Sequence, residues 1–350
     1  MRLVIALAAA MTIASASAAA PAVDVAQPGT VEVKVAKIKA FAFAGGRTGP
    51  LKLGYRTLGT PHKGADGQVD NAVLLLHGTG GDSAAFLGAR AALLFGPGAP
   101  LDIARTFVIL PDGIGSGASS RPGEAQGVNF PHYDYSDMVR AERAIVRDTL
   151  GVGRLRLILG VSMGAMHAWT WATDFPAEAD TIVALGAWPV AVGGRNLLWR
   201  LTARDALLAS PLPGGTGARV AAGVTMLANV PAARLGRIAP DAAGVRTALD
   251  AATVNMIEPI DLAFQLDAVR TYDPSAKLDR ITAHVVALNF ADDPLYPPEN
   301  DPLPAIARRL PRIATITVPA SDRTIGHATL GDTAVWLPYV EGAIRAALAR

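Results

Sequence analysis

The stretch that decides the fold is Gly160-Val161-Ser162-Met163-Gly164, which fits the pattern G-x-S-x-G. Before it, residues 155–159 alternate leucine with arginine or isoleucine, as expected of a strand entering a core. After it, Met163 to Phe175 is largely apolar and free of proline, which predicts a buried helix that stops at Pro176. A strand, a glycine-flanked turn and a helix form a nucleophile elbow, which holds its serine in a strained conformation. Because G-x-S-x-G also arises by chance, the remaining parts of a catalytic site must be found elsewhere in the chain.

A serine nucleophile of this kind needs a histidine base later in the chain. Of the six histidines, only His284 and His327 lie well beyond Ser162. His284 lies in the apolar segment 281–290 and is predicted to be a satisfied core or sheet residue. His327 follows Gly326 in a polar loop behind the predicted strand 314–318, which favours it as the base. The alternative is an exposed loop histidine without a role.

An acid that orients the base should follow the preceding strand. The predicted strand 283–290 runs into Ala291-Asp292-Asp293-Pro294-Leu295-Tyr296-Pro297-Pro298. Adjacent aspartates before prolines make a rigid turn that can aim one carboxylate at an imidazole and hold its tautomer. We choose Asp293 as the acid and keep Asp292 as the fallback, because an Asx turn accounts for one of the two.

The oxyanion hole is expected after the apolar strand 72–76, which ends in His77-Gly78-Thr79-Gly80-Gly81. Backbone N–H groups after a strand, kept accessible by glycines, can stabilise a developing oxyanion. We predict that Thr79 and Met163 donate these N–H groups, with Gly80 as the alternative to Thr79. His77 is predicted to be a hydrogen-bonding residue of the turn.

These residues together resemble the α/β-hydrolase fold superfamily from about residue 50 to the end, and within it the homoserine O-acetyltransferase group. Further matching stretches are Leu110-Pro111-Asp112-Gly113-Ile114-Gly115-Ser116-Gly117, Asp137-Met138-Val139 and Ser162-Met163-Gly164-Ala165-Met166. The resemblance implies an α/β fold with a mostly parallel sheet flanked by helices and an inserted helical cap. It also implies Ser162 as nucleophile, Asp293 as acid and His327 as base, and it suggests Arg204 as a substrate-contacting residue.

The chain differs from that group at a residue expected to recognise the substrate. In the acetyltransferases the residue after Gly-His is typically an aspartate that pairs with the amino group of the amino-acid substrate, whereas here it is Ala328. A site without that charge should not select homoserine, because a buried cation would stay unpaired. We therefore expect a serine hydrolase acting on an ester, with an amide as second choice, through an acyl-enzyme on Ser162. The alternatives are an O-acyltransferase of the homoserine type and a non-catalytic binding protein on the same fold.

The chain divides into four expected parts. Residues 1–18, with a charged start, an apolar run and Ala16-Ser17-Ala18, predict a signal peptide and export to the periplasm or the medium. Residues 19–189 form the first part of the core, 190–275 a helical cap and 276–350 the rest of the core. In the cap, Trp199 and Arg200 could face substrate, although tryptophan and leucine at helical spacing are more typical of packing.

Within these parts, local patterns predict several further elements. Opening strands are expected at 31–35 and 51–55, and a helix near 84–94. A second helix is expected over 136–150, with Asp134 or Ser136 as its cap, and a final helix over 332–348.

Composition excludes several other classes of function. The 350 residues carry a formal net charge of +2, and the arginines are scattered, so the sequence contains no basic stripe of the kind that binds nucleic acid. The chain has no cysteine, and its histidines lack metal-ligand spacing, so no metal site is expected. Residues 113–117 lack G-x-G-x-x-G, so no cofactor is assigned. No segment after the leader is expected to span a membrane, although 51% of the residues are hydrophobic. The expected partner is a small acyl substrate, and a dimer is possible.

Overall fold

The computed structural model describes residues 24–25, 30–89, 91–125 and 127–349, so the expected signal peptide lies outside the described residues. An eight-stranded sheet with the order β1-β2-β4-β3-β5-β6-β7-β8 forms the centre of the molecule. The hairpin of β1 and β2 is antiparallel and pairs antiparallel with β4, while the remaining strands are parallel. This confirms the predicted mostly parallel α/β architecture. The strands are β1 (Lys34–Ala42), β2 (Thr48–Leu58), β3 (Ala72–Leu76), β4 (Phe107–Pro111), β5 (Leu155–Val161), β6 (Ala179–Leu185), β7 (His284–Phe290) and β8 (Ile313–Val318).

Helices cover both faces of this sheet. The central strand β3 is buried at every residue, as expected of a parallel strand packed on both sides. One face packs against α3 (Tyr135–Ala144), α4 (Met163–Asp174) and α10 (Leu303–Arg309). The other face packs against α1 (Ala92–Phe95) and α11 (Thr333–Leu348). Trp169 and Trp171 of α4 and Trp336 of α11 are fully buried, so these two helices carry much of the apolar packing.

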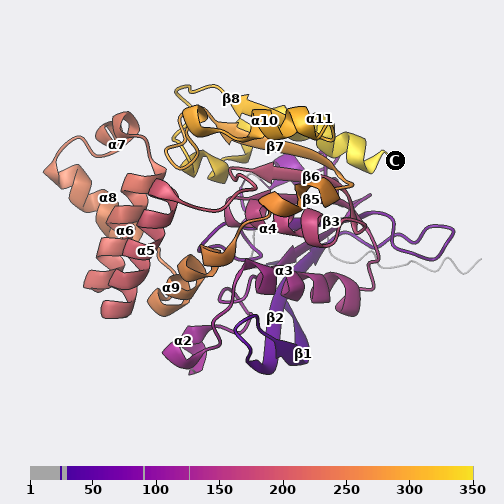
Figure 1. Cartoon of the computed structure of the whole chain (residues 1–350), viewed down its shortest axis with the longest axis horizontal. Coiled ribbons are helices and arrows are strands. Elements are labelled where there is room, and N and C mark those ends of the chain that lie inside the picture. The colour runs from indigo at the N-terminus through magenta and orange to yellow at the C-terminus, as the bar shows by residue number, and fades with distance from the viewer. Residues whose placement is uncertain (1–23, 26–29, 90, 126, 350) are drawn as a thin grey trace, which may run out of the picture.

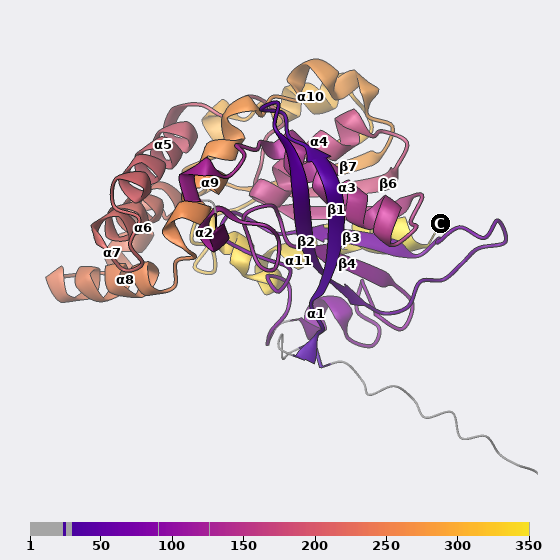
Figure 2. The same cartoon turned by 90° about the horizontal axis from the view of Figure 1, so that it is seen from below.

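Five helices stand between β6 and β7 and gather at one side of the molecule in both views (Figures 1 and 2). Helix α5 packs against α6 and α9, and α6 packs against α8. We call α5 to α9 the cap; they lie within the segment 190–275, whose exact domain limits stay a prediction. The cap helices are α5 (Gly194–Ala209), α6 (Thr216–Asn229), α7 (Ala232–Ile238), α8 (Ala242–Val254) and α9 (Pro259–Asp267).

Short helical segments complete the fold. They are α2 (Pro122–Ala125), a π-helical turn at 145–149, and 3₁₀ turns at 127–129, 268–271, 275–280, 298–300 and 328–331. None of the helices in the described ranges is long and apolar enough to cross a membrane.

Some element boundaries differ from the sequence-based expectation. The prediction of a helix near 84–94 is wrong, since among the described residues of that segment α-helix begins only at Ala92 and runs to Phe95. Gly88 adopts a φ of +110°, which breaks a right-handed helix, and its N–H donates to the carbonyl of Val25. The opening strands are displaced or longer than expected, at 34–42 and 48–58. Asp134 is confirmed as the cap of α3, where its carboxylate accepts the N–H of Asp137.

Candidate active site

Ser162 stands on a strained turn between β5 and α4. Its φ of +52° is the only positive value at a non-glycine residue among the described ones. A Cβ at Gly160 would lie 2.1 Å from the carbonyl oxygen of Gly164, and a Cβ at Gly164 would lie 2.2 Å from that of Leu76. Neither position can hold a side chain, which explains both glycines of the motif. The turn therefore has the geometry of the predicted elbow.

In the structure, two consecutive hydrogen bonds connect the predicted serine, histidine and aspartate. The Oγ of Ser162 lies 2.8 Å from Nε2 of His327, and Nδ1 of His327 lies 2.7 Å from Oδ2 of Asp293. The carboxylate only accepts, so Nδ1 carries the proton and Nε2 is left to accept the serine hydroxyl. Asp293 is 1% exposed and His327 is 7% exposed, so water hardly competes for these hydrogen bonds. The arrangement can move a proton from Ser162 to His327.

The two adjacent aspartates have different contacts. Oδ1 of Asp293 accepts the N–H of Leu295 at 2.8 Å, while its Oδ2 holds the imidazole. Asp293 thus forms an Asx turn and orients His327 at the same time. Oδ2 of Asp292 instead accepts the N–H of Gly326 at 3.2 Å, so this side chain anchors the loop and does not touch the ring. The geometry favours Asp293 over the fallback Asp292.

The loop after β3 lies directly beside the elbow. Leu76 pairs in register with Gly160, and a Cβ placed on Gly78 would lie 3.5 Å from the Cβ of Ser162. The N–H of Gly80 donates to Oε1 of Gln265 at 3.0 Å and is therefore not free to bind an oxyanion. Within the described part of the chain, the N–H of Thr79 donates to no other group, as an oxyanion donor requires. This favours Thr79 over Gly80 as the partner of the Met163 N–H.

His77 fixes the shape of that loop. Its Nε2 accepts the N–H of Gly113 at 3.0 Å, and its Nδ1 donates to the carbonyl of Gly78 at 2.8 Å. Burial lowers the pKa of His77, which keeps the ring neutral and able to make both bonds. The predicted hydrogen-bonding role of His77 is confirmed.

A cavity of about 590 Å³ opens between Ser162 and the cap. Among the predicted residues, Thr79, Ser162, His327 and the cap residue Trp199 line it, together with Arg200 and many apolar side chains. No aspartate or glutamate of the described residues is part of the lining. The size suits a small-molecule ligand.

Arg204, which the family resemblance suggested as a substrate contact, is not among the residues lining this cavity. Its guanidinium pairs with Asp205 at 2.7 Å and with Asp267 at 2.6 Å. The position of Arg204 therefore gives no support to a substrate contact. Arg200, one helical turn earlier on α5, lines the cavity instead.

Two residues of the cap segment that position the site had no signal in the sequence. Gln265 joins Gly80 to the carbonyl of Gly115, to which its Nε2 donates at 2.9 Å. The carbonyl of Asn229 accepts the N–H of His327 at 3.0 Å. Neither belongs to a motif, because the contacts depend on how the cap folds back over the core.

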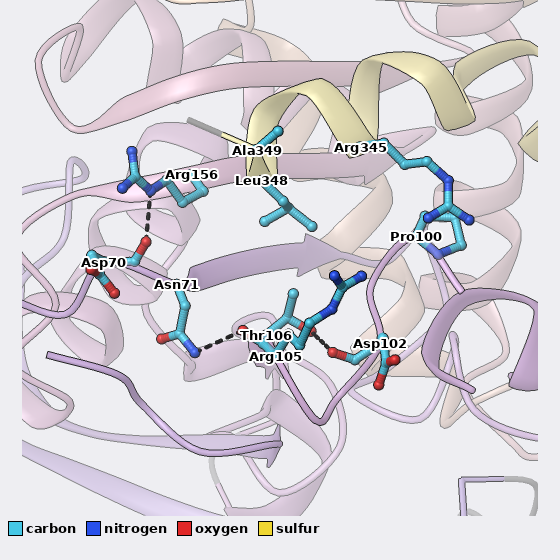
Figure 3. Close-up of a pocket in the computed structure, with 10 residues that line it drawn as sticks. All are labelled: Asp70, Asn71, Pro100, Asp102, Arg105, Thr106, Arg156, Arg345, Leu348 and Ala349. Carbon is cyan, nitrogen blue, oxygen red and sulfur yellow. Dashed lines mark hydrogen bonds between the residues drawn. The ribbon is translucent and has the colours of Figure 1, made fainter. Parts of the chain in front are cut away.

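A second cavity of about 430 Å³ lies at the other end of the parallel strands (Figure 3). Arg105, Arg156 and Arg345 line it with Asp70 and Asp102, and Arg156 donates to the carbonyl of Asp70. Ligands of open α/β sheets bind outside the carboxyl ends of the strands, whereas this cavity adjoins the amino ends. It contains none of the predicted site residues.

Comparison with known proteins shows what the chain resembles. A family model described as alpha/beta hydrolase fold matches residues 71–211. A probable acyltransferase from Methanothermobacter thermautotrophicus is 29% identical over 302 residues, which cover 83% of this chain and 91% of that protein. A homoserine O-acetyltransferase from Solidesulfovibrio magneticus is 35% identical over 184 residues. That match covers 48% of this chain and 45% of the acetyltransferase, so the chain matches less than half of that relative.

Solved structures show the same fold at low identity. An acetylester hydrolase from Corynebacterium glutamicum has a TM-score of 0.77 at 18% identity, covering 91% of this chain and 96% of that one. A homoserine O-acetyltransferase from Bacillus anthracis has a TM-score of 0.76 at 18% identity, covering 91% and 98%. The chain therefore has the α/β-hydrolase fold and, within the proteins of that fold, resembles the homoserine O-acetyltransferase group.

Proposed function

We propose that this protein is a serine hydrolase that cleaves an ester through an acyl-enzyme on Ser162. The observation that carries the proposal is the line of hydrogen bonds from Ser162 through His327 to Asp293, which ends at a cavity of about 590 Å³. A nucleophile, a base and a buried acid in this order are the requirements of acyl transfer through a serine.

In the first half-reaction, Nε2 of His327 takes the hydroxyl proton of Ser162 while Oγ attacks the ester carbonyl carbon. The backbone N–H groups of Thr79 and Met163 stabilise the resulting oxyanion. When the intermediate collapses, the alcohol leaves with the proton from His327, and the acyl group stays on Ser162. The carboxylate of Asp293 holds the ring in place and stabilises the imidazolium that forms.

In the second half-reaction, the acyl group passes to an acceptor, and we propose that this acceptor is water. His327 takes a proton from the water, the hydroxyl attacks the acyl carbon, and Ser162 recovers its proton as the acid departs. Among the described residues the cavity offers no carboxylate for an ammonium-bearing acceptor, and Ala328 replaces the expected aspartate. Acyl transfer to an alcohol is the second candidate, favoured by the acyltransferase names of the relatives.

The test compares Ser162→Ala with the wild type on p-nitrophenyl acetate and butyrate. We expect kcat/KM to fall about 10⁴-fold or more, because loss of the nucleophile removes the covalent route. Ser136→Ala, an exposed serine on α3, is the matched control and should keep full activity. Ester hydrolysis within a few-fold of wild type in Ser162→Ala would disprove the proposal.

We also propose that the protein is exported after cleavage behind Ala18. Cleavage two residues later would leave Pro21 at the start of the mature chain, which is less favourable. Intact-mass measurement of protein from its native host should give a chain that begins at or near Ala19. A full-length chain that retains Met1 would contradict export.

A further inference from the structure

Arg200 is a buried cation in the wall of the active-site cavity. It lies on α5, is 1% exposed, and lines the same cavity as Ser162 and His327. Its Nε donates to Oδ1 of Asn196 at 3.0 Å, and its Nη1 donates to the hydroxyl of Tyr135 at 3.4 Å. Both partners are neutral groups.

No carboxylate pairs with Arg200 among the described residues, whereas Arg204 on the same helix pairs with two. A guanidinium keeps its charge in proteins, and a buried charge without a counter-ion is costly. The ring of Trp199, 4.8 Å from the guanidinium carbon, offers only a partial substitute for an anion. An unpaired cation that faces a cavity is therefore suited to a ligand that brings the missing negative charge.

The free part of the guanidinium has the right chemistry for that ligand. Neither N–H of Nη2 has a hydrogen-bond partner among the described residues, while Nε and Nη1 are held by Asn196 and Tyr135. Those two bonds fix the plane of the group before a ligand arrives, so little freedom is lost on binding. No acidic side chain of the described residues lines the cavity to repel an anion.

We propose that Arg200 binds a carboxylate carried by the ester substrate, so that the enzyme prefers anionic esters to neutral ones. The inference rests on the proposed hydrolase function and names its substrate class. Arginine binds carboxylates through paired, charge-assisted hydrogen bonds, which give both affinity and orientation. The carboxylate sits on the acyl part or on the alcohol part, and the experiment distinguishes these two sources.

The alternative is a purely structural role, in which Arg200 ties the cap to Tyr135 of α3. Loss of a structural role would lower the hydrolysis of all esters equally. The informative quantity is therefore the ratio of kcat/KM for an anionic ester to kcat/KM for the uncharged ester of the same shape. For the alcohol side, the pair is 3-carboxyphenyl acetate and 3-carbamoylphenyl acetate. For the acyl side, the pair is the mono-p-nitrophenyl ester of glutaric acid and that of its half-amide.

We expect the wild type to favour the anionic member of at least one pair. Arg200→Gln should lower that ratio about 10-fold or more, mainly through KM, because truncating one partner of a buried charge pair is expensive. Arg200→Lys should restore part of the ratio, since the charge is kept but the planar fork is lost. Arg204→Gln, the matched control on the same helix, should leave the ratio within a few-fold of wild type.

Two outcomes would overturn the inference. One is a wild type that hydrolyses neutral esters through Ser162 without preferring either anionic ester, a result that does not depend on whether any variant folds. The other is an unchanged ratio in an Arg200→Gln protein that still reacts with a fluorophosphonate at Ser162. The proposed hydrolase function fails separately, if the folded wild type hydrolyses none of the four esters and Ser162 does not react with the probe.

Discussion

The carbonyl oxygen of Asn229, the last residue of the cap helix α6, accepts the backbone N–H of His327 at 3.0 Å. The preceding Gly326 has a φ of +63°, and a Cβ there would lie 2.8 Å from that same carbonyl and 2.6 Å from Cδ of Pro231. The end of α6 therefore packs directly against the loop that presents the imidazole. The cap both covers the cavity and positions the base.

Gly326→Ala should lower ester hydrolysis at least about 10-fold while the protein stays folded. An alanine with positive φ costs on the order of 1–3 kcal/mol, and the clash with Asn229 would move the loop that holds His327. The loss should appear in kcat for every ester, measured beside a thermal melt. Gly342→Ala on α11, where an added Cβ meets no atom within 4 Å and which does not line the cavity, is the matched control. Equal activity in the two variants would show that the cap does not position His327.

Asp293→Ala should be far more damaging than Asp292→Ala. Only Asp293 touches the imidazole, at 2.7 Å, and loss of the orienting carboxylate costs about 10⁴-fold in related triads. Asp292 holds the N–H of Gly326, so its removal should cost a smaller factor by loosening the loop. Steady-state kcat on p-nitrophenyl acetate decides the order. An inactive Asp292→Ala beside an active Asp293→Ala would reverse the assignment.

The parts of the site that were predictable from sequence lie on short, local patterns. Gly160 and Gly164 flank Ser162 because neither position has space for a Cβ, so the motif itself encodes the turn. The apolar run 72–76 is a fully buried strand, and the predicted strand 283–290 contains β7, which is buried except near its start; their carboxyl ends lead into Thr79 and Asp293. In parallel sheets these ends meet at one edge, so strand order along the chain is enough to gather the residues.

The parts that were missed depend on contacts across long distances in the chain. The helix expected near 84–94 failed because Gly88 takes a left-handed conformation that apolar periodicity does not show. Gln265 and Asn229 act through the fold of the cap, which has no motif. The difference between Arg200 and Arg204 follows from the location of Asp205 and Asp267, and the spacing of arginines on a helix does not reveal it.

Ala328→Asp should increase acyl transfer to an amino-bearing acceptor. Ala328 lines the cavity next to His327, so a carboxylate there would offer the counter-ion that an ammonium lacks in the wild type. With acetyl-CoA and homoserine, the wild type should form no O-acetylhomoserine above background, and Ala328→Asp should form a detectable amount. Ala328→Asn is the uncharged control and should resemble the wild type. Saturable transfer by the wild type, with kcat near the enzyme median of about 10 s⁻¹, would favour the acyltransferase candidate.

The central claim is that Ser162 is an activated nucleophile, and covalent labelling tests it most directly. A fluorophosphonate probe reacts with a serine whose hydroxyl is activated by a base, as the 2.8 Å contact with Nε2 of His327 should activate Ser162. We predict one adduct per chain by intact mass, located on Ser162 by peptide mapping and missing in folded Ser162→Ala. A folded wild type that stays unlabelled, or an adduct on another residue, would contradict the account and favour a binding protein that keeps the fold without the chemistry.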